Sequence, residues 1–280
     1  MRTIHSLSEN FSDGLLFPKG TSAERGNPEA GYFRYNTETK GIEVYDGTSW
    51  SSMDNTPSYV TDGLVLNLDA GNLNSYDGSG NTWSDLAQDG NDGTVNGATY
   101  DSSGYFAFDG NDSVDLGNDE IFTLANRKAS WEAWIKFDNA TGTEAILTKW
   151  ENTSNNENWW FGRHDNNKMH LAFRINGVYY PYLSSGSILN LANTWYQACA
   201  TLNGTDLKFY INGALDSSFS VASGTWSSSS SKMAVGCQNL TAGGAAFMNG
   251  GIGAIRCYDK ALSSDEVTQN FNAKKTRFGL

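Results

Sequence analysis

The sequence predicts an all-β protein, namely an antiparallel two-sheet sandwich preceded by a small β-hairpin unit and closed by one short helix. Charged residues make up only 18% of the chain, whereas Gly, Ser, Asn and Thr are abundant. This composition favours short strands joined by polar turns. Aromatic residues account for 13%, which is ample material for a packed core. From Gly63 onward, short apolar or alternating runs recur to the C-terminus, separated by Gly, Asn, Asp or Ser.

Residues 1–55 form the first expected unit. Phe33 and Tyr35, and then Ile42 and Val44, alternate with polar neighbours on either side of the turn NTETKG, which predicts a β-hairpin. A hairpin alone is only marginally stable in water. The preceding segment, FPKGTSAERGNPEAG, carries two of the chain's four prolines, and we expect it to be extended and poor in internal hydrogen bonds. The unit therefore needs a surface to lie against.

A polar linker is expected at residues 56–61, and the sandwich at residues 62–280. Its predicted strands are GLVLNLDA, GYFAFDG, SWEAWIKF, EAILTKW, NWWFGR, MHLAFRI, TWYQACATL, DLKFYI, KMAVGC and GGIGAIRCYD. Asn203-Gly204 and Asn212-Gly213 fall between alternating runs, and Asn-Gly supplies the positive φ angles of type I′ turns. They predict a three-stranded antiparallel meander.

The segment LSSDEVTQNFNAKK predicts the helix. Ser263 and Glu266 fit a capping box, and acidic residues fill the first turn. Val267 and Phe271 share one face, by which the helix is expected to dock.

Charge and hydropathy exclude two classes of partner. The net charge of −12 repels phosphate backbones, and no Lys/Arg cluster offsets it, so nucleic-acid binding is excluded. No stretch of about 18 apolar residues predicts a membrane span. The N-terminus lacks the apolar core of a secretory signal, so we expect the chain to stay in the cytosol of the cell that makes it.

Three cysteines, Cys199, Cys237 and Cys257, each lie in an apolar or alternating run. An odd number cannot close into a disulfide framework, so we expect buried thiols. One pair across neighbouring strands is the alternative.

Several pieces of the larger region form a recognisable pattern. They are GLVLNLDAGNLNSY, the FDG that follows an aromatic strand, the Y-x-N-G hairpin, and the block G-x-I-R-x-Y-x-x-A-L-S-x-x-E-V that leads into the helix. Over residues 62–280 they resemble the laminin-G-like branch of the concanavalin A-like lectin/glucanase superfamily. The resemblance implies a jelly-roll sandwich.

The first unit carries a second pattern, P-x-G-T-x-A-x-R, then G-x-x-R-Y-N-T, then E-V-Y-D-G-T-x-W. Residues 17–50 thereby resemble a short module of tailed-phage virion proteins. This resemblance implies that residues 1–55 attach the chain to a bacteriophage particle or join copies of it, with a homotrimer favoured. The implied partners are other virion proteins of the capsid or tail, and the implied location is the virion, assembled in the host cytoplasm.

Relatives of the fold include glycoside hydrolases, whose retaining chemistry needs two carboxylates about 5 Å apart. Their E-x-D-x-x-E or E-x-D-x-E motif is absent. Glu132 is the nearest candidate, but Trp134 occupies the next position on the same strand face. The sequence therefore predicts that the protein is not an enzyme.

The resemblance also implies a structural calcium ion, because such relatives hold calcium through Asp, Asn and backbone oxygens. Asp109, Asn111, Asp112 and Asp115 in FDGNDSVDLG are oxygen donors of that kind. The alternative is that these residues only form a tight turn.

Glycan binding in this fold relies on exposed aromatic rings flanked by polar side chains. Two segments have this composition, WENTSNNENWWFGRHD and GVYYPYL. Their candidate residues are Trp150, Asn155, Asn156, Trp159, Trp160, Arg163, His164, Tyr179, Tyr180 and Tyr182. Trp159 and Trp160 must face opposite sides of a strand, so one of them belongs to the core. The tyrosine cluster fits an interface equally well.

An arginine-aromatic set on a coreless hairpin is typical of an obligate contact surface. In the first unit this set is Arg25, Arg34, Tyr35, Tyr45 and Trp50. The alternative is that these side chains fold back on the large domain.

The sequence as a whole predicts a non-enzymatic virion protein, either a tail fibre or receptor-binding protein or a capsid decoration protein, whose lectin-like domain contacts host-surface glycans. The alternatives are a lectin or glycoside hydrolase of the same superfamily, and an architectural protein without a ligand.

Overall fold

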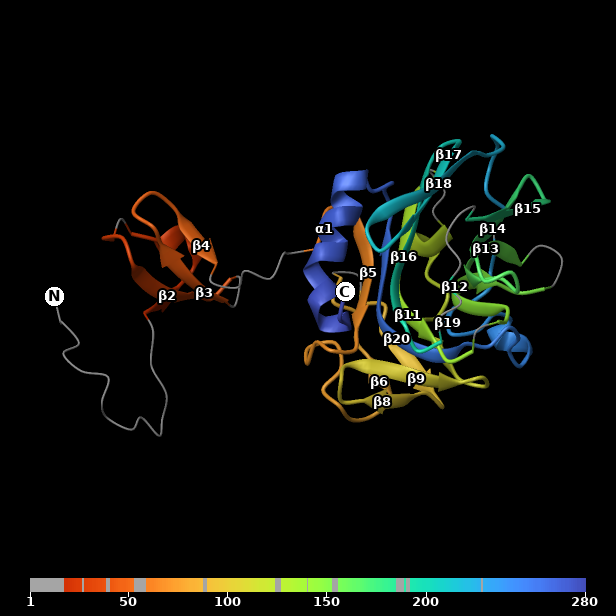
Figure 1. Ribbon diagram of the computed structural model, residues 1–280, viewed down its shortest axis with the longest axis horizontal. Coiled ribbons are helices and arrows are strands. Elements are labelled where there is room, and N and C mark those ends of the chain that lie inside the picture. Colours follow the sequence, from red (N-terminus) through yellow and green to blue (C-terminus); the bar gives the residue numbers. More distant parts are fainter. Residues whose placement is uncertain are drawn as a thin grey trace. The chain divides into compact units, whose positions relative to one another are not determined.

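The computed structural model describes residues 18–26, 28–38, 41–52, 59–87, 90–123, 127–139, 141–152, 156–184, 189, 192–227 and 229–280. The chain forms two compact units, Met1–Pro57 and Ser58–Leu280 (Figure 1). None of the helices in the described ranges is long and apolar enough to cross a membrane.

The larger unit is a sandwich of two sheets, which confirms the predicted fold class. The first sheet runs, in spatial order, β15 (Val178–Leu183), β14 (Met169–Ile175), β13 (Glu157–Arg163), β12 (Glu144–Trp150), β19 (Met233–Val235), β10 (Ser113–Asp115), β7 (Gly93–Asn96) and β6 (Thr82–Trp83). The second sheet runs β18 (Ala214–Ser220), β17 (Asp206–Ile211), β16 (Trp195–Asn203), β11 (Lys128–Phe137), β20 (Asn249–Tyr258), β9 (Tyr105–Asp109) and β8 (Thr99–Asp101), with β5 (Leu64–Asp69) also paired to β20.

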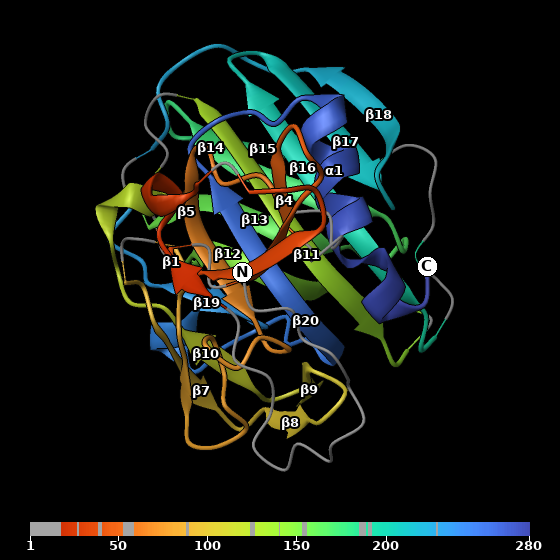
Figure 2. The same ribbon diagram turned by 90° about the vertical axis from the view of Figure 1, so that its left-hand side faces the viewer.

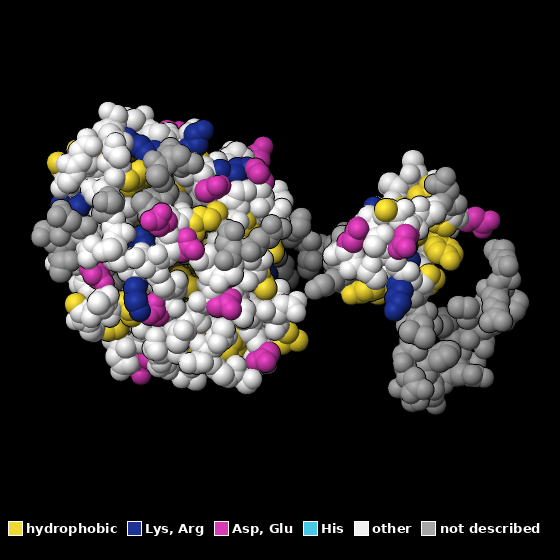
Figure 3. Space-filling view, turned by 180° about the vertical axis from the view of Figure 1, so that it is seen from behind, with side chains coloured by type: hydrophobic (Ala, Val, Ile, Leu, Met, Phe, Trp, Pro, Cys, Tyr) yellow, Lys and Arg dark blue, Asp and Glu magenta, His cyan; other side chains and the backbone are white. Residues whose placement is uncertain are grey.

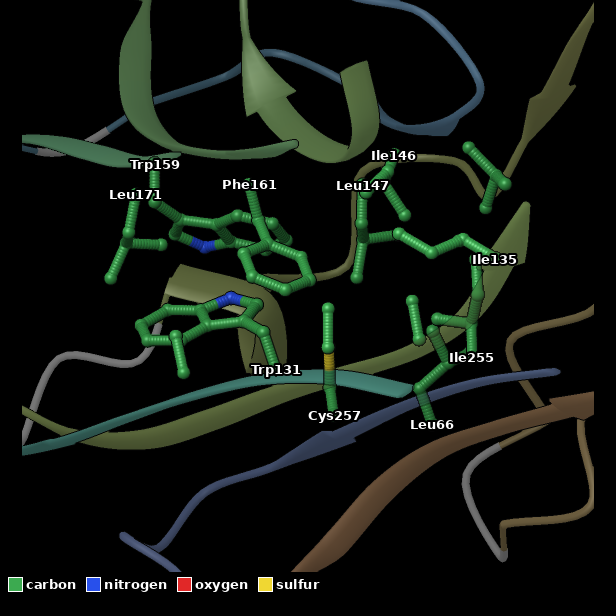
Figure 4. Packing of buried hydrophobic residues seen from close by; sticks show 14 of the residues in the cluster. Leu66, Trp131, Ile135, Ile146, Leu147, Trp159, Phe161, Leu171, Ile255 and Cys257 are labelled. Atoms are coloured by element: carbon green, nitrogen blue, oxygen red, sulfur yellow. The ribbon is translucent and has the colours of Figure 1, made fainter. Parts of the chain in front are cut away.

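The core lies between the two sheets, because every second side chain of a strand points to the same side. Trp131 of β11 faces Trp159 and Phe161 of β13 across this space (Figure 4). The rings of Trp131 and Trp159 lie 5.5 Å apart. Full burial of each such side chain contributes roughly 1.5–3 kcal/mol to folding.

The single α-helix of the described ranges, α1 (Ser264–Lys274), covers the side of the second sheet away from the core (Figures 1 and 2). Ser263 and Glu266 form the predicted capping box. Val267 is buried, and Phe271 stacks on Trp134 of β11 with ring centroids 5.8 Å apart. The helix prediction is confirmed. Short 3₁₀ helices are η1 (Ser22–Glu24), η2 (Glu120–Thr123), η3 (Leu240–Ala242) and η4 (Lys275–Phe278).

A buried ion pair ties this helix to the second sheet. Arg256 Nη1 donates to Glu132 Oε1 at 3.0 Å, and Arg256 Nε donates to Asn67 Oδ1 at 3.2 Å. Asn270 of α1 donates through Nδ2 to Glu132 Oε2 at 2.6 Å and also lies 2.9 Å from the Tyr258 hydroxyl. Glu132, the acidic residue considered as a catalytic candidate, thus accepts hydrogen bonds from Arg256 and Asn270 in the interior of the domain.

The start of the larger unit joins the same network. The amide of Val60 donates to Asn270 Oδ1 at 2.8 Å, and the ring of Tyr59 lies under Arg256 with its centroid 4.3 Å from Cζ. Residues 59 and 60 were expected in the linker, but they pack into the sandwich unit. Their apolar and aromatic side chains explain the difference, because burial stabilises them here.

The meander prediction is confirmed with one change of turn. Asn212 and Gly213 have φ of 51° and 77°, as a type I′ turn requires. At the other hairpin, Asn203 pairs with Asp206 as the last residue of β16. The turn there consists of Gly204 and Thr205, so glycine takes the first central position, where its φ is 63°. The three cysteines are buried free thiols, as predicted.

The smaller unit is a sheet in the order β1 (Lys19–Gly20), β2 (Tyr32–Asn36), β3 (Gly41–Tyr45) and β4 (Trp50–Ser52). The hairpin of β2 and β3 is confirmed. The segment before it is more ordered than expected, because β1 pairs with β2 and η1 is closed by a capping box of Thr21 and Glu24. The proposed extended segment therefore makes its own hydrogen bonds.

We predict that Glu132→Gln lowers the free energy of unfolding of the larger unit by about 3–5 kcal/mol, because the buried Arg256 cation loses its counter-charge. Denaturant unfolding followed by tryptophan fluorescence measures this loss. Lys208→Gln, which breaks an exposed pair with Asp206, is the control and should cost less than about 1 kcal/mol. Equal effects of the two substitutions would contradict the prediction.

Candidate functional site

A pocket of about 390 Å³ opens on the outer face of the first sheet, over β12, β13, β14 and β15. Aromatic rings dominate its lining, with a carboxylate, a guanidinium and amide groups among them. The lining residues are Thr143, Trp150, Asn152, Glu157, Trp160, His164, His170, Ala172, Arg174, Tyr179, Gln238 and Ala246. A concave site of this kind, mainly apolar with a few convergent polar groups, is typical of ligand binding.

A β-bulge in β13 decides which side chains reach this pocket. Lys149 pairs with Trp159, but the next residue of β12, Trp150, pairs with Glu157. Asn158 is therefore an extra residue, and its Nδ2 donates to the carbonyl of Ser227 at 2.7 Å. Without the bulge, Glu157 would share the core-facing side of Trp159. The bulge turns Glu157 to the outer face.

Regular alternation supplies the rest of the pocket wall. In β14, Leu171 and Phe173 belong to the core, so His170, Ala172 and Arg174 point outward. In β15, Tyr179 pairs with Arg174 and lies on the same outer face.

Three contacts between rings shape the pocket. Trp150 and Tyr179 meet edge to face with ring centroids 5.8 Å apart. Trp160 lies beside His170 at 5.1 Å, and His164 meets His170 at 5.2 Å. Tyr179 is 44% exposed, whereas Trp160 is 4% exposed. Tyr179 thus lies at the exposed rim of the pocket, and Trp160 forms part of its buried wall.

Buried polar atoms in the pocket have no hydrogen-bond partner among the described residues. They are Nε1 of Trp160 and both ring nitrogens of His170. A buried polar group without a partner costs roughly 1–3 kcal/mol. These atoms are shielded from solvent, so they lie in the wall of the pocket and not on its open surface.

The polar rim is held by its own contacts. The Arg174 guanidinium forms an ion pair with Glu157 and donates through Nη1 to the carbonyl of Gly177 at 2.7 Å. Trp150 Nε1 donates to Asn152 Oδ1 at 2.9 Å. The ion pair and the hydrogen bond to Gly177 hold Glu157 and Arg174 in place, and together the two side chains carry no net charge.

The loop that leads from β19 to β20 closes one side of the pocket. Gln238 and Ala245 exchange backbone hydrogen bonds, which folds the loop back on itself. The amide of Ala145 in β12 then donates to the carbonyl of Ala246 at 2.8 Å. Gln238 and Ala246 reach the pocket in this way.

Several of the predicted glycan-binding residues come together here and others do not. Trp150, Trp160, Tyr179 and His164 line the pocket. Trp159 belongs to the core, which confirms that the two adjacent tryptophans divide between the faces.

The remaining candidates lie elsewhere. Arg163 is buried against Glu144 at 2.7 Å, and Tyr180 and Tyr182 pack on the core. Asn156 accepts a hydrogen bond from the Ser230 hydroxyl at 2.8 Å. Asn155 lies outside the described residues.

Sequence reasoning missed Glu157, His170 and Arg174. The alternation H-x-A-x-R in MHLAFRI is a signal for the last two, since it marks the polar face of a strand next to the aromatic cluster. Glu157 reaches the pocket only because of the bulge, and Gln238 and Ala246 reach it on a loop that is distant in the sequence. No local sequence pattern therefore indicates these three residues.

Two of the predicted calcium ligands have partners within the fold. Asp112 Oδ2 accepts from the amide of Asp109 at 2.8 Å, and Asp115 pairs with Lys232. Asn111 is exposed. The described residues contain no group of three or more His, Cys, Asp or Glu side chains placed to hold a metal. Calcium binding stays a prediction that calorimetry with Ca²⁺ would check.

In the smaller unit, the predicted contact residues divide between the two faces of the sheet. Arg25 and Arg34 both pair with Glu43. Tyr45 and Trp50 lie together with ring centroids 5.4 Å apart. Tyr35 pairs with Ile42 on the opposite face.

Comparison with known families decides the classification of the larger unit. A family model described as the concanavalin A-like lectin/glucanases superfamily, of the laminin-G type, matches residues 108–268. The chain belongs to this superfamily. The match spans the pocket strands, the pocket loop and the first turn of α1, which agrees with the resemblance found in the sequence.

Solved structures confirm the concanavalin A-like jelly roll. The binding domain of botulinum neurotoxin DC, solved in complex with rat synaptotagmin II, has a TM-score of 0.56 at 18% identity and covers 76% of this chain. The serotype D binding domain is equally similar, with a TM-score of 0.56 over 77% of this chain. The present chain spans about half of each, 52% and 53%.

A third neighbour is matched over nearly its whole length. Domain 4 of AbnA, a GH43 extracellular arabinanase from Geobacillus stearothermophilus in complex with arabinotriose, has a TM-score of 0.56 at 18% identity and covers 74% of this chain and 97% of its own. Comparison with curated proteins gives no match. Because the identities are only 18%, these structures establish the fold of the larger unit alone.

We predict a stability effect of the pocket histidine. Burial, helped by the neighbouring His164, lowers the pKa of His170 to about 4. Between this value and the ordinary pKa of about 6.5, only the unfolded chain takes up the proton, so stability falls as the pH falls. From pH 7.5 to 4.5 the wild type should lose roughly 2–3 kcal/mol more than His170→Gln.

Urea unfolding at a series of pH values measures that difference. His164→Gln is the comparison variant, and it should keep most of the wild-type slope, because burial is the main cause of the low pKa of His170 and His164 only adds to it. A His170→Gln variant with an unchanged pH dependence would contradict the prediction.

Proposed function

We propose that the protein is a non-enzymatic bacteriophage virion protein whose sandwich domain binds glycans through the pocket on β12–β15. In this proposal the smaller unit attaches the chain to the capsid or tail as a homo-oligomer, with a trimer favoured. The sandwich is displayed outward as a tail-fibre tip, receptor-binding domain or capsid decoration.

The observation that carries the glycan part is the composition of the pocket. The Trp150, Trp160 and Tyr179 rings offer faces and edges on which the C–H side of a sugar stacks. The rim of Glu157 and Arg174 and the amide side chains of Asn152 and Gln238 offer hydrogen bonds to hydroxyls. Aromatic walls with convergent polar groups suit a sugar better than a purely apolar ligand.

The neighbours support this choice of ligand. The arabinanase domain 4 was solved with arabinotriose, and one of the botulinum neurotoxin DC structures was solved with SialylT. Many displayed copies would convert a weak single-site affinity into firm retention.

A glycoside hydrolase is the rival proposal. Among the described residues that line the pocket, Glu157 is the one carboxylate, and Arg174 already pairs with it. Retaining and inverting chemistry both need two. Release of reducing sugars from mixed β-glucans would favour the rival.

The virion part rests on the resemblance of residues 17–50 to a phage module. It predicts that the chain is found in purified particles and that deletion of residues 2–52 abolishes its incorporation. Mass spectrometry of the particles measures incorporation, and cryo-electron microscopy distinguishes head from tail. Particles that carry the truncated chain at the normal level would contradict the attachment role.

For the pocket, we predict that Tyr179→Ala weakens binding roughly two- to tenfold, because it removes about 0.5–1.5 kcal/mol of aromatic contact. A glycan array identifies ligands, and calorimetry with the best array ligand and with arabinotriose measures affinity. Val178→Ala is the control, since Val178 is exposed next to Tyr179 but does not line the pocket. Equal affinities of the two variants would place the binding site elsewhere.

A further inference from the structure

We infer that the pocket takes an oligosaccharide of at least two sugar units, which lies along β14 with one unit at each end of the pocket. The inference rests on the proposed function and names the class of glycan that the same site binds. It is carried by the separation of two partly exposed rings, Tyr179 at one end and His164 at the other, which line one pocket.

The pairing of the strands sets the distance between the two ends. Tyr179 of β15 pairs with Arg174 of β14, whereas His164 lies against His170 of β14 with ring centroids 5.2 Å apart. Arg174 and His170 are four residues apart in one strand, which corresponds to about 13 Å along the strand. A single sugar ring is much shorter than this span, so it cannot occupy both ends at once.

The Tyr179 end has a ring contact and polar atoms of its own. Tyr179 is 44% exposed, and Trp150 stands beside it with ring centroids 5.8 Å apart. The ion pair of Glu157 and Arg174 lies on the same side of the pocket and presents polar atoms to sugar hydroxyls. This end can therefore hold one sugar unit by stacking and hydrogen bonding.

The His164 end repeats this combination with different residues. The side chain of His164 is 37% exposed. Glu144 of β12 pairs with Arg163 of β13, so the residues next to them, Thr143 and His164, lie at the same end of the pocket. Thr143 is exposed and supplies a hydroxyl group. A second sugar unit thus finds a ring and a hydrogen-bonding group here as well.

The floor of the pocket between the two ends is low. Ala172 lies midway between His170 and Arg174 on the outer face and carries only a methyl group. It pairs with Trp160, whose indole lies close over Gly162, because a Cβ atom at Gly162 would come within 2.7 Å of Cη2 of Trp160. Neither Ala172 nor Trp160 therefore rises as a barrier between the two ends.

Charge favours uncharged sugar units. The chain carries a net charge of −12, which repels polyanionic glycans, and Arg174 in the pocket is already paired with Glu157. Figure 3 shows Lys and Arg side chains of the larger unit scattered among Asp and Glu side chains on the face in view. Arabinotriose, an uncharged trisaccharide, is therefore a suitable probe, and arabinose is its single unit.

Calorimetry on the full chain tests the inference by ligand length. One pair of probes is arabinotriose and arabinose, and the other is the best array oligosaccharide and its terminal monosaccharide. The longer sugar should bind at least about fivefold more tightly than its single unit, because it makes ring contacts at both ends. Equal affinities of the two sugars would overturn the inference.

Substitutions at the two ends distinguish two subsites from one. Tyr179→Ala and His164→Ala should each weaken binding of the longer sugar roughly two- to tenfold, and in the double variant the two factors should multiply, because the rings lie too far apart to interact. Only one of the two substitutions should weaken binding of the single unit. If both weaken it, or if His164→Ala leaves the affinity for the longer sugar unchanged, the inference is wrong.

Val178→Ala is the control, because Val178 is exposed and does not line the pocket, and it should keep both affinities. Urea unfolding of each variant shows that it is folded under the conditions of calorimetry. A chain that binds neither sugar of either pair contradicts the proposed function itself. A chain that binds both sugars of a pair equally contradicts only the inference of two subsites.

Discussion

Strand β13 contains one residue more than regular pairing with β12 allows, and the pocket depends on it. The extra residue, Asn158, is buried and anchored to the carbonyl of Ser227. Because of this bulge, Glu157 faces outward beside Trp150, while Trp159 two residues later faces the core. A bulge that re-aims a side chain is a known device next to functional sites. It allows one strand to serve both the core and the pocket.

The outer faces of the two sheets differ in what covers them. The second sheet buries its outer face under α1, through the stacking of Phe271 on Trp134 and the network of Glu132, Arg256 and Asn270. The first sheet leaves part of its outer face open between β12 and β15, with a folded loop on one side. The helix and its ion pair therefore stabilise the domain, and the open face is free for a ligand.

Much of the fold follows from local patterns, whereas the site follows only in part. Alternation predicted the strands, the capping box of Ser263 and Glu266 predicted the helix, and Asn212-Gly213 predicted its turn. The aromatic segments pointed to Trp150, Trp160 and Tyr179. Glu157 could not be predicted, because a bulge is set by pairing between strands.

A crystal structure of the chain with its best array oligosaccharide tests the central claim most directly. The account predicts a sugar ring packed against Tyr179 and Trp150, with a hydroxyl hydrogen-bonded to the Glu157–Arg174 pair. A sugar bound on the second sheet, or at the loops that join the two sheets, would contradict it.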